Sequence, residues 1–396
     1  MLICSGPIGD IMLKQPITRI RDKNRIINNI INVMSEHKTF LVLGHTSPDE
    51  DCVSSMVAIA LLLNRFDKAV TINIAKKTHD NVSYLLRICK FNAIKIVHNP
   101  SKLPRTPDTV IICDTAKRSM LERSKAIDKL LADPKIIKIE IDHHIAGDSE
   151  HLGDPDYALV TAASSASELV GLIGLKLKGR RDVLSRFMVL DPLSRNFVLA
   201  VITGIIGDTQ KGRYLKSRRE KRYYDIFTCM FEDILMKSTV RETNFFKIDD
   251  VFYELYNLSV KEDECYKSLE NRHGLNGRVA SMVLGREEVQ ALKERFDDEI
   301  VISVFRALAN NMAEESGGVS LIAYYDLDPA SGLVQFRMRR SHSYKDFDLR
   351  TVMDIFGITN GGGHEGAIGF RLPEELVPDP ARYVAEMIER LNRELG

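Results

Sequence analysis

Aspartate and histidine residues gather in four short stretches of the chain, and each stretch directly follows an apolar segment. The stretches are His45-Thr-Ser-Pro-Asp49-Glu-Asp51, Asp114, Asp142-His143-His144 and Gly207-Asp208-Thr209. Carboxylate oxygens together with neutral imidazole nitrogens suit divalent cations such as Mn²⁺, Fe²⁺ or Zn²⁺. These residue types therefore indicate a metal centre, provided that the fold brings the four stretches together.

The apolar segments before these stretches have the patterns of buried strands and of a buried helix. Thr39–Leu43, Thr109–Cys113 and Lys135–Ile141 are short, largely apolar runs, which predict strands. Asn196–Ile206 predicts a buried helix. Because parallel strands place their carboxyl ends at one edge of a sheet, we expect the aspartates and histidines to converge there.

Convergence of the aspartates requires a source of positive charge. Asp49, Asp51, Asp114 and Asp208 near one point would repel one another unless protons or cations neutralise them. With the two histidine positions, six ligands are too many for one ion and suit two. Asp114 stands alone at its strand end, so we expect it to bridge them. Two cations about 3.5–4 Å apart activate a water molecule and neutralise a phosphoryl group, which indicates phosphoester hydrolysis.

Each stretch also has an ordinary structural explanation. Asp-x-Asp after a strand is common in turns, and a lone Asp114 or Asp208 is typical of a helix cap. Cys52 and Cys113 each flank a ligand candidate, but strand geometry points Cys113 away from Asp114, which argues against a thiolate zinc site. The joint occurrence at four separate element ends favours the metal centre.

The 396 residues predict two α/β domains. Residues 1–210 form the first, with a mainly parallel sheet. We expect helices at residues 18–37 and Met56–Leu63, a strand at Ala69–Ala75, and a helix that starts at a Ser165–Glu168 capping box. A helical connector, residues 211–276, contains a basic stretch, 211–222, that is either a solvated helix face or a track for a short nucleic-acid strand.

The second, smaller α/β domain is expected over residues 277–396. Its predicted elements are a strand at Arg278–Leu284, a hairpin of Val319–Tyr325 and Leu333–Arg339, and helices at Leu349–Phe356 and Pro380–Leu395. The turn between the hairpin strands, residues 326–332, is rich in turn formers.

Composition excludes several classes of function. The formal net charge is zero, with 55 basic and 55 acidic residues, so the whole-molecule basic field of a long-duplex DNA binder is absent. The six cysteines are scattered, which is typical of reduced thiols in the cytoplasm. The longest apolar run, Met56–Leu63, is too short to cross a membrane, and we expect no signal peptide. A cytoplasmic location is therefore expected.

Taken together, the four stretches resemble the four motifs of the DHH superfamily of phosphoesterases. Downstream, Gly361-Gly362-Gly363-His364-Glu-Gly-Ala367-Ile-Gly369 resembles the GGGHxxAxG signature of the DHH-associated C-terminal domain of the first type. The subgroup that the chain most resembles comprises nano-RNases, 3′-phosphoadenosine-5′-phosphate (pAp) phosphatases and cyclic-dinucleotide phosphodiesterases.

The resemblance implies a role for each motif residue. One Mn²⁺ would be held by His45, Asp49 and Asp114, and the other by Asp51, Asp114, His143 and Asp208. Mg²⁺ or Co²⁺ are also compatible with these ligands. His144 would face the substrate, as a phosphate contact or proton donor, and Asp142 would orient a neighbouring histidine.

In the second domain, the resemblance places a substrate phosphate against Gly362, Gly363 and His364. Consecutive glycines let backbone N–H groups approach an anion, although a bare glycine run is most often a flexible turn. The family's substrate-binding Arg-Ser pair corresponds to Arg340 and Ser341. Arg339 takes this place if the strand is shifted by one residue, and an arginine-rich edge strand also serves to prevent aggregation.

The expected function is therefore a Mn²⁺-dependent phosphodiesterase or phosphatase that hydrolyses short oligonucleotides, linear or cyclic dinucleotides, or pAp with a two-metal-activated water. The alternatives are an inorganic pyrophosphatase or exopolyphosphatase, a single-strand DNA exonuclease, and a non-catalytic nucleotide sensor. The expected partner is a small nucleotide or short oligonucleotide, with no long duplex DNA and no membrane. A homodimer is compatible with the sequence.

Overall fold

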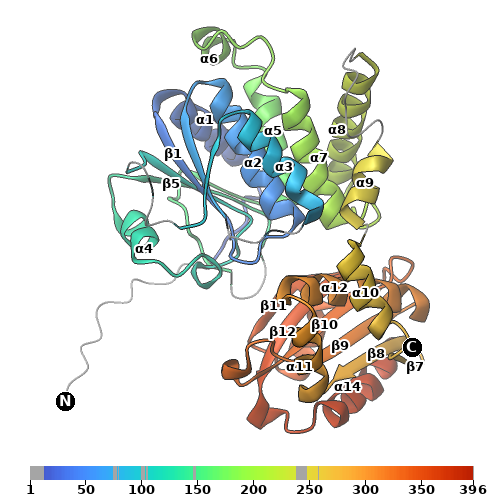
Figure 1. Ribbon diagram of the computed structural model, residues 1–396. Coiled ribbons are helices and arrows are strands. Elements are labelled where there is room, and N and C mark those ends of the chain that lie inside the picture. The colour runs from blue at the N-terminus through green and yellow to red at the C-terminus, as the bar shows by residue number, and fades with distance from the viewer. Residues whose placement is uncertain are drawn as a thin grey trace, which may run out of the picture. The chain divides into compact units, whose positions relative to one another are not determined.

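The computed structural model describes residues 13–74, 78, 80–99, 103, 106–145, 149–237, 248–256 and 258–395. The chain forms two compact units, Met1–Asn257 and Leu258–Gly396 (Figure 1). Both units combine a six-stranded sheet with helices, so the predicted two-domain α/β class is confirmed.

The first unit is built on a sheet in which every neighbouring pair of strands is parallel. Its strand order is β3-β2-β1-β4-β5-β6. The three strands predicted to carry the acidic stretches are confirmed, with ends shifted by at most two residues. The short strands β3 and β6 were not predicted. The strands are β1 (Thr39–Leu43), β2 (Ala69–Asn73), β3 (Lys95–Val97), β4 (Thr109–Cys113), β5 (Ile137–Asp142) and β6 (Ala158–Val160).

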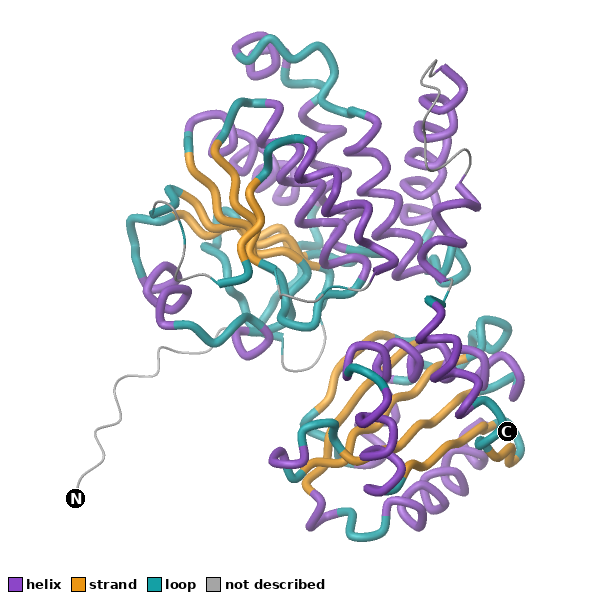
Figure 2. Tube along the Cα trace, in the orientation of Figure 1, coloured by secondary structure: helices purple, strands orange, loops and turns teal. Residues whose placement is uncertain are grey.

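Helices cover both faces of this sheet (Figures 1 and 2). Alternating side chains of β1 serve the two faces: Phe40 and Val42 lie in the larger core, whereas Leu41 and Leu43 lie in a smaller core with Ile127. The helices of the unit are α1 (Ile20–Glu36), α2 (Glu50–Arg65), α3 (Ser83–Phe91), α4 (Lys125–Ala132), α5 (Ala166–Leu177), α6 (Arg181–Arg186), α7 (Arg195–Thr209), α8 (Arg218–Lys237) and α9 (Ile248–Tyr256).

The strand order creates a switch point between β1 and β4. The chain leaves β1 to form β2 on one side, whereas β4 lies on the other side of β1. In open parallel sheets, ligands bind in the crevice at the carboxyl ends of two such strands. The stretch that begins at His45 follows β1 and Asp114 follows β4, so both lie at this crevice.

The second unit contains a mixed sheet with the order β11-β12-β10-β9-β8-β7. β8 and β9 are parallel, and the other neighbouring pairs are antiparallel, including the predicted hairpin of β9 and β10. The strands are β7 (Gly274–Asn276), β8 (Val279–Leu284), β9 (Val319–Tyr325), β10 (Leu333–Arg340), β11 (Gly361–His364) and β12 (Ala367–Pro373).

Two separate cores flank this second sheet. α14 packs on one face, where Phe336 and Phe370 stack, and α11 and α12 pack on the other face over Ile322 and Tyr324. The helices of the unit are α10 (Val260–Leu269), α11 (Arg286–Arg295), α12 (Asp298–Ser316), α13 (Arg350–Phe356) and α14 (Pro380–Leu395).

The stretch 211–276, expected as a connector, is divided between the two units. Phe227 and Phe231 of α8 are fully buried in the core of the first unit, and Cys265 and Leu269 of α10 are buried in the second. Within the basic stretch, Arg219 forms an ion pair with the buried Glu168 at 2.8 Å. Part of the positive charge of this stretch is therefore neutralised inside the first unit.

Two expectations from composition can be compared with the described residues. The five cysteines among them are free thiols. No helix in this part of the chain has the length and apolar character that spanning a bilayer requires.

Candidate metal centre

His45 and Asp49 form the first part of the centre, in the loop between β1 and α2. Asp49 is the N-cap of α2, and its Oδ1 accepts a hydrogen bond from the Cys52 N–H at 3.1 Å. This cap starts α2 at Glu50, six residues before the predicted start. His45 Nε2 lies 3.7 Å from Asp49 Oδ1 and 3.6 Å from Asp114 Oδ2, so one imidazole faces two carboxylates.

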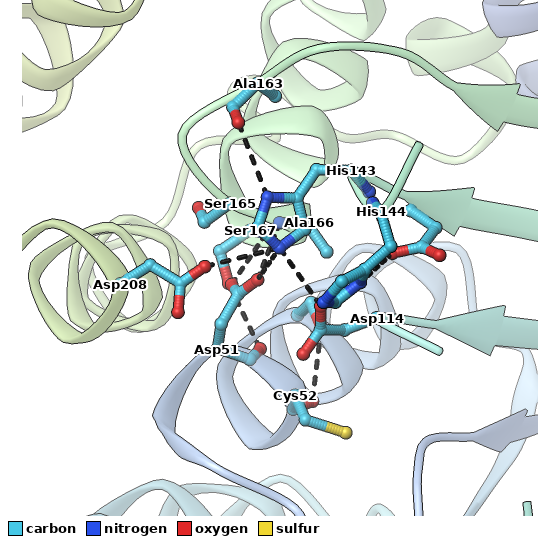
Figure 3. Close-up of polar contacts among 12 residues, drawn as sticks. Asp51, Cys52, Asp114, His143, His144, Ala163, Ser165, Ala166, Ser167 and Asp208 are labelled. Atoms are coloured by element: carbon cyan, nitrogen blue, oxygen red, sulfur yellow. Dashed lines mark hydrogen bonds and ion pairs between the residues drawn. The ribbon is translucent and has the colours of Figure 1, made fainter. Parts of the chain in front are cut away.

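His143, Asp51 and Asp208 form the second part, and they come from three different elements (Figure 3). His143 Nε2 lies 3.3 Å from Asp208 Oδ2, 3.4 Å from Asp114 Oδ1 and 3.9 Å from Asp51 Oδ2. The other ring nitrogen, Nδ1, is 3.4 Å from the Ala163 carbonyl oxygen. A hydrogen bond to this carbonyl directs Nε2 toward the three carboxylates.

Asp114 belongs to both parts. Its Oδ2 faces His45 and its Oδ1 faces His143, and only 2% of the residue is exposed. Its backbone has φ +47°, a left-handed conformation that aspartate tolerates better than most residues. Asp114 Oδ1 accepts no hydrogen bond from any described residue, so a buried oxygen is left for another electrophilic partner. The predicted bridging position is consistent with this geometry.

Asp51 is fixed by the start of α5. Its Oδ2 accepts a hydrogen bond from the Ala166 N–H at 2.6 Å, and its Oδ1 accepts one from the Ser167 N–H at 2.9 Å. Ser165 caps the same helix by accepting from the Glu168 N–H, as the sequence predicted. The Glu168 carboxylate, however, accepts from the Ser164 N–H instead of completing the box at Ser165.

Gly204 allows α7 to bring Asp208 to the centre. A Cβ atom at Gly204 would lie 2.1 Å from Ser167 Oγ and 2.6 Å from Asp51 Oδ1. Gly207 has the same function toward Glu50, whose Cβ would be 2.6 Å away. These two glycines permit α7 to pack closely on α2 and α5. Gly204 could not be predicted from the sequence, because a glycine within an apolar helix gives no local signal of what lies opposite.

Asp142 and His144 form a hydrogen-bonded pair beside the metal ligands. Asp142 Oδ1 accepts from the backbone N–H groups of His143 at 2.8 Å and His144 at 3.2 Å, and it lies 2.8 Å from His144 Nδ1. The predicted orienting role of Asp142 agrees with these contacts. Lys14, which no motif marks, also contacts the carboxylate of Asp142.

The carboxylates of the centre fall into two groups, one with raised and one with lowered pKa values. Burial and the charge of Asp114 raise the pKa of Asp51 to about 7, and burial and the charge of Asp51 raise the pKa of Asp208. Burial also acts on Asp114, but His143 and His45 outweigh it and lower the pKa of Asp114. The carboxylates of the centre therefore bear more negative charge than the nearby side chains neutralise.

The pKa values of the two histidines are raised as well, although burial acts on them in the opposite direction. Burial alone would lower the pKa of His143, but Asp114 and Asp208 outweigh it and raise the value well above its usual range. Burial also lowers the pKa of His45, but Cys52, Asp114 and Asp49 together outweigh it and raise the value. Without metal, the two imidazoles therefore bind protons. These protons must leave before the ring nitrogens can act as neutral ligands of a cation.

The donor atoms fit divalent cations. Asp51, His143 and Asp208 offer ligand atoms within 4.8 Å of one another, as do His45, Cys52 and Asp114. Burial raises the pKa of the Cys52 thiol to about 11 in the metal-free protein. Apart from the Cys52 sulfur, the donors of these two groups are carboxylate oxygens and imidazole nitrogens, which suit divalent cations.

The predicted glycine run is a strand in the second unit. Gly361–His364 forms β11 at the edge of the sheet and pairs with β12, so it is not a flexible turn. Gly363 has φ +142°, and a Cβ atom there would lie 2.1 Å from the Ala367 carbonyl oxygen. Gly362 is exposed and has open space around its missing side chain. His364 Nδ1 accepts a hydrogen bond from the Gly366 N–H at 3.2 Å.

Strand register shows which arginines accompany this edge. Arg337 pairs with Gly369, which pairs with Gly362, and Arg339 pairs with Ala367, which pairs with His364. Side chains at directly paired positions share a face of the sheet. Arg337 and Arg339 therefore lie on the same face as the positions of Gly362 and His364.

Arg340 and Ser341, expected to bind substrate, are directed into the second unit. Arg340 is 4% exposed, and its guanidinium donates to the carbonyl oxygens of Lys345 at 3.1 Å and Phe347 at 2.6 Å. Ser341 is buried and donates to Glu314 at 3.1 Å. In this conformation both residues hold the loop that follows β10.

Comparison with known proteins identifies the first unit. Residues 39–205 match the DHH family, N-terminal domain, so this part of the first unit is similar to that domain. The match does not extend to the glycine-histidine segment, and the resemblance of the second unit to a GGGH-type domain stays a prediction. No curated protein is significantly similar in sequence.

Solved structures share the fold of the chain. An exopolyphosphatase-related protein from Bacteroides fragilis has a TM-score of 0.64 at 18% identity, over 94% of this chain and 98% of that one. RecJ in complex with Mn²⁺ from Thermus thermophilus has a TM-score of 0.52 at 12% identity, over 96% of this chain and 56% of that one. The chain thus shares the fold of these two proteins.

Replacing Asp114 by asparagine should remove metal binding while keeping the fold. Asparagine tolerates the same left-handed backbone but lacks the charge that both parts of the centre share. We expect Mn²⁺ affinity, measured by titration calorimetry, to fall at least about tenfold. Circular dichroism should be unchanged. Wild-type affinity in Asp114→Asn would contradict the shared role of Asp114.

Thermal stability of the metal-free protein should fall as the pH rises from about 5.5 to about 8. Asp51, with a pKa raised from 3.8 to about 7, and Asp208 bind extra protons when folded, so their stabilising contribution is lost as pH rises through that range. The raised histidine pKa values act in the same direction above about pH 6.5. We expect the metal-free protein to melt at a lower temperature at about pH 8 than at about pH 5.5.

Divalent cations should cancel this loss by replacing the protons. Saturating Mn²⁺ should therefore raise the melting temperature more at about pH 8 than at about pH 5.5. Differential scanning fluorimetry with Mn²⁺ and with chelator measures both gains. Equal gains at the two pH values would mean that the titrating carboxylates do not bind the cation.

Proposed function

We propose that this protein is a divalent-cation-dependent phosphoester hydrolase whose substrates are small nucleotides. Short oligonucleotides, linear or cyclic dinucleotides and pAp are the substrate class. The observation that carries the proposal is the position of Asp114, whose two oxygens face His45 and His143 from a buried site. A carboxylate shared by two His-Asp groups suits a two-cation centre for phosphoryl chemistry.

The ligand residues divide between two cation positions, for which Mn²⁺ is the proposed occupant and Mg²⁺ or Co²⁺ are compatible. His45, Asp49 and Asp114 would hold one, and Asp51, Asp114, His143 and Asp208 would hold the other. When bound, such cations supply water activation and neutralise the charge of the phosphoryl group. The hydrogen bonds from α5 to Asp51 and from Cys52 to Asp49 keep both carboxylates in place beforehand.

His144 is proposed to act on the substrate. With Nδ1 held by Asp142, its other nitrogen, Nε2, is available to contact a phosphoryl oxygen or to donate a proton to the leaving group. Its side chain is 31% exposed, whereas that of His143 is 13% exposed. This difference in exposure agrees with a ligand role for His143 and a substrate role for His144.

The second unit is proposed to bind a substrate phosphate at the β11–β12 edge. Gly362 and Gly363 leave backbone groups accessible there, and His364 and the arginines of β10 supply polar contacts. Arg337 and Arg339 share this face, and Arg340 and Ser341 support the adjacent loop. A contact that fixes a terminal phosphate favours small substrates over long polymers.

An exopolyphosphatase or inorganic pyrophosphatase activity is the second candidate, supported by the likeness in fold to the exopolyphosphatase-related protein. A single-strand exonuclease has the likeness to RecJ in its favour, although the chain covers 56% of that protein. A nucleotide sensor without catalysis is the remaining alternative, and the complete set of ligands disfavours it.

A substrate panel should separate these activities. The panel contains pApA, cyclic di-AMP, pAp, a five-nucleotide and a twenty-nucleotide RNA, single-stranded DNA, pyrophosphate and polyphosphate, each assayed with Mn²⁺ and with chelator. We expect Mn²⁺-dependent release of nucleotide from the small substrates and about tenfold slower turnover of the longest RNA. Phosphate release from polyphosphate alone would contradict the proposal, and dinucleotide binding without hydrolysis would identify a sensor.

Replacing Arg339 by alanine should weaken substrate binding. Loss of a charged hydrogen-bond donor to phosphate costs about 1.5–3 kcal/mol, so KM should rise roughly tenfold or more while kcat changes less. Arg371, on the same face at the other end of β12, provides the control, and Arg371→Ala should leave KM near the wild-type value. Arg340→Ala should instead lower the melting temperature. If kcat falls more than KM rises in Arg339→Ala, this arginine acts in the chemical step.

A further inference from the structure

A buried lysine lies next to the metal centre, on a segment that precedes the DHH match. Residues 13–17 run along the region after β5 and before α5. The Lys14 N–H donates to the Ser149 carbonyl oxygen at 2.8 Å, the Gln15 N–H to His151 Nε2 at 3.1 Å, and the Ile17 N–H to the Val160 carbonyl oxygen at 2.8 Å. These bonds place the Lys14 side chain, which is 0% exposed, inside the first unit.

The ammonium group of Lys14 contacts the ends of two central strands. Its Nζ donates to the Thr115 carbonyl oxygen at 2.7 Å, lies 3.0 Å from Glu140 Oε1 and contacts Asp142 Oδ2. Thr115 directly follows Asp114, and Asp142 directly precedes His143. The ammonium group of Lys14 thus contacts the backbone just after the candidate ligand Asp114 and the side chain just before the candidate ligand His143.

The charges around Lys14 account for its burial. Glu140 and Asp142 are two residues apart on β5, so they lie on the same face of the strand, and both side chains are 0% exposed. Glu140 Oε2 also accepts from the Gly153 N–H and lies 3.0 Å from His151 Nδ1. Among the described residues, the ion-pair partners of Asp142 are Lys14 and His144. Of the two, only Lys14 is positively charged throughout the neutral pH range.

We propose that Lys14 is a positioning residue for the DHH histidines and acts through Asp142. By holding Oδ2 of this carboxylate, Lys14 aims Oδ1 at the backbone N–H groups of His143 and His144 and at His144 Nδ1. Those bonds set the imidazole of His143 toward Asp114 and Asp208 and fix the orientation of His144. The inference rests on the proposed function of the same site.

Lys14→Met tests the proposal, because methionine keeps much of the length and loses the ammonium. Gln15→Ala is the matched control, since the Gln15 residue is exposed and its anchoring bond comes from the backbone. Removing such supporting contacts weakens metal binding or activity about 10- to 100-fold in known metal sites. We expect Lys14→Met to bind Mn²⁺ at least about tenfold more weakly and to lose kcat, with Gln15→Ala unchanged.

The sign of the change in Mn²⁺ affinity distinguishes positioning from simple charge. Removing a nearby positive charge would by itself strengthen cation binding, so tighter or unchanged binding in Lys14→Met, measured below its melting temperature, would overturn the proposal. In an Asp142→Asn background, Lys14→Met should have no further effect, because the residue through which Lys14 acts has already been altered. Independent effects of the two substitutions would also overturn it.

Nuclear magnetic resonance of histidine labelled with nitrogen-15 gives a readout without metal or substrate. The Nδ1–H signal of His144 should be protected from exchange in the wild type and lost in Lys14→Met. Should Lys14→Met fail to fold, Lys14→Arg provides the second variant, and it should recover part of the Mn²⁺ affinity and of the protected signal. Wild-type protein that binds no Mn²⁺ would reject the proposed function, whereas an unchanged signal in Lys14→Met would reject this inference alone.

Discussion

Repulsion among buried carboxylates is the constraint on which the first unit depends. Asp51, Asp114 and Asp208 are held near one histidine by elements that are far apart in the chain. The fold restrains each carboxylate separately: α5 donates two N–H bonds to Asp51, a left-handed turn directs Asp114, and glycines bring α7 close enough to place Asp208. Such preorganisation is useful only if a cation completes the site, because the repulsion otherwise persists.

The neutralising groups that the protein does supply lie at the periphery of the cluster. Lys14 compensates Glu140 and Asp142, and Arg219 compensates Glu168 beyond the start of α5. Asp51, Asp114 and Asp208 face imidazoles in the ion pairs of the described residues. The side chains of Lys14 and Arg219 thus neutralise carboxylates around the centre and leave the negative charge of the candidate ligands in place.

Local sequence pattern predicted those features that depend on neighbours in the chain. Apolar runs marked β1, β4 and β5, and the polar residues after each run marked side chains that the fold brings close together. Features set by contacts across the fold were not predictable in this way. Lys14 lies 128 residues from Asp142, and Gly204 gives no sign of the side chains that oppose it. On β10, a shift of one residue exchanges the faces of Arg339 and Arg340, and the pairing with β9 and β12 fixes that register.

Asp51 joins the metal centre to the beginning of a helix. Its two oxygens accept the first amide groups of α5, so any change in the charge or position of this carboxylate changes hydrogen bonds that stabilise the first turn. The amide hydrogens of Ala166 and Ser167 consequently act as built-in reporters. Their solvent-exchange rates and chemical shifts follow the occupancy of the centre and require neither turnover nor a labelled ligand.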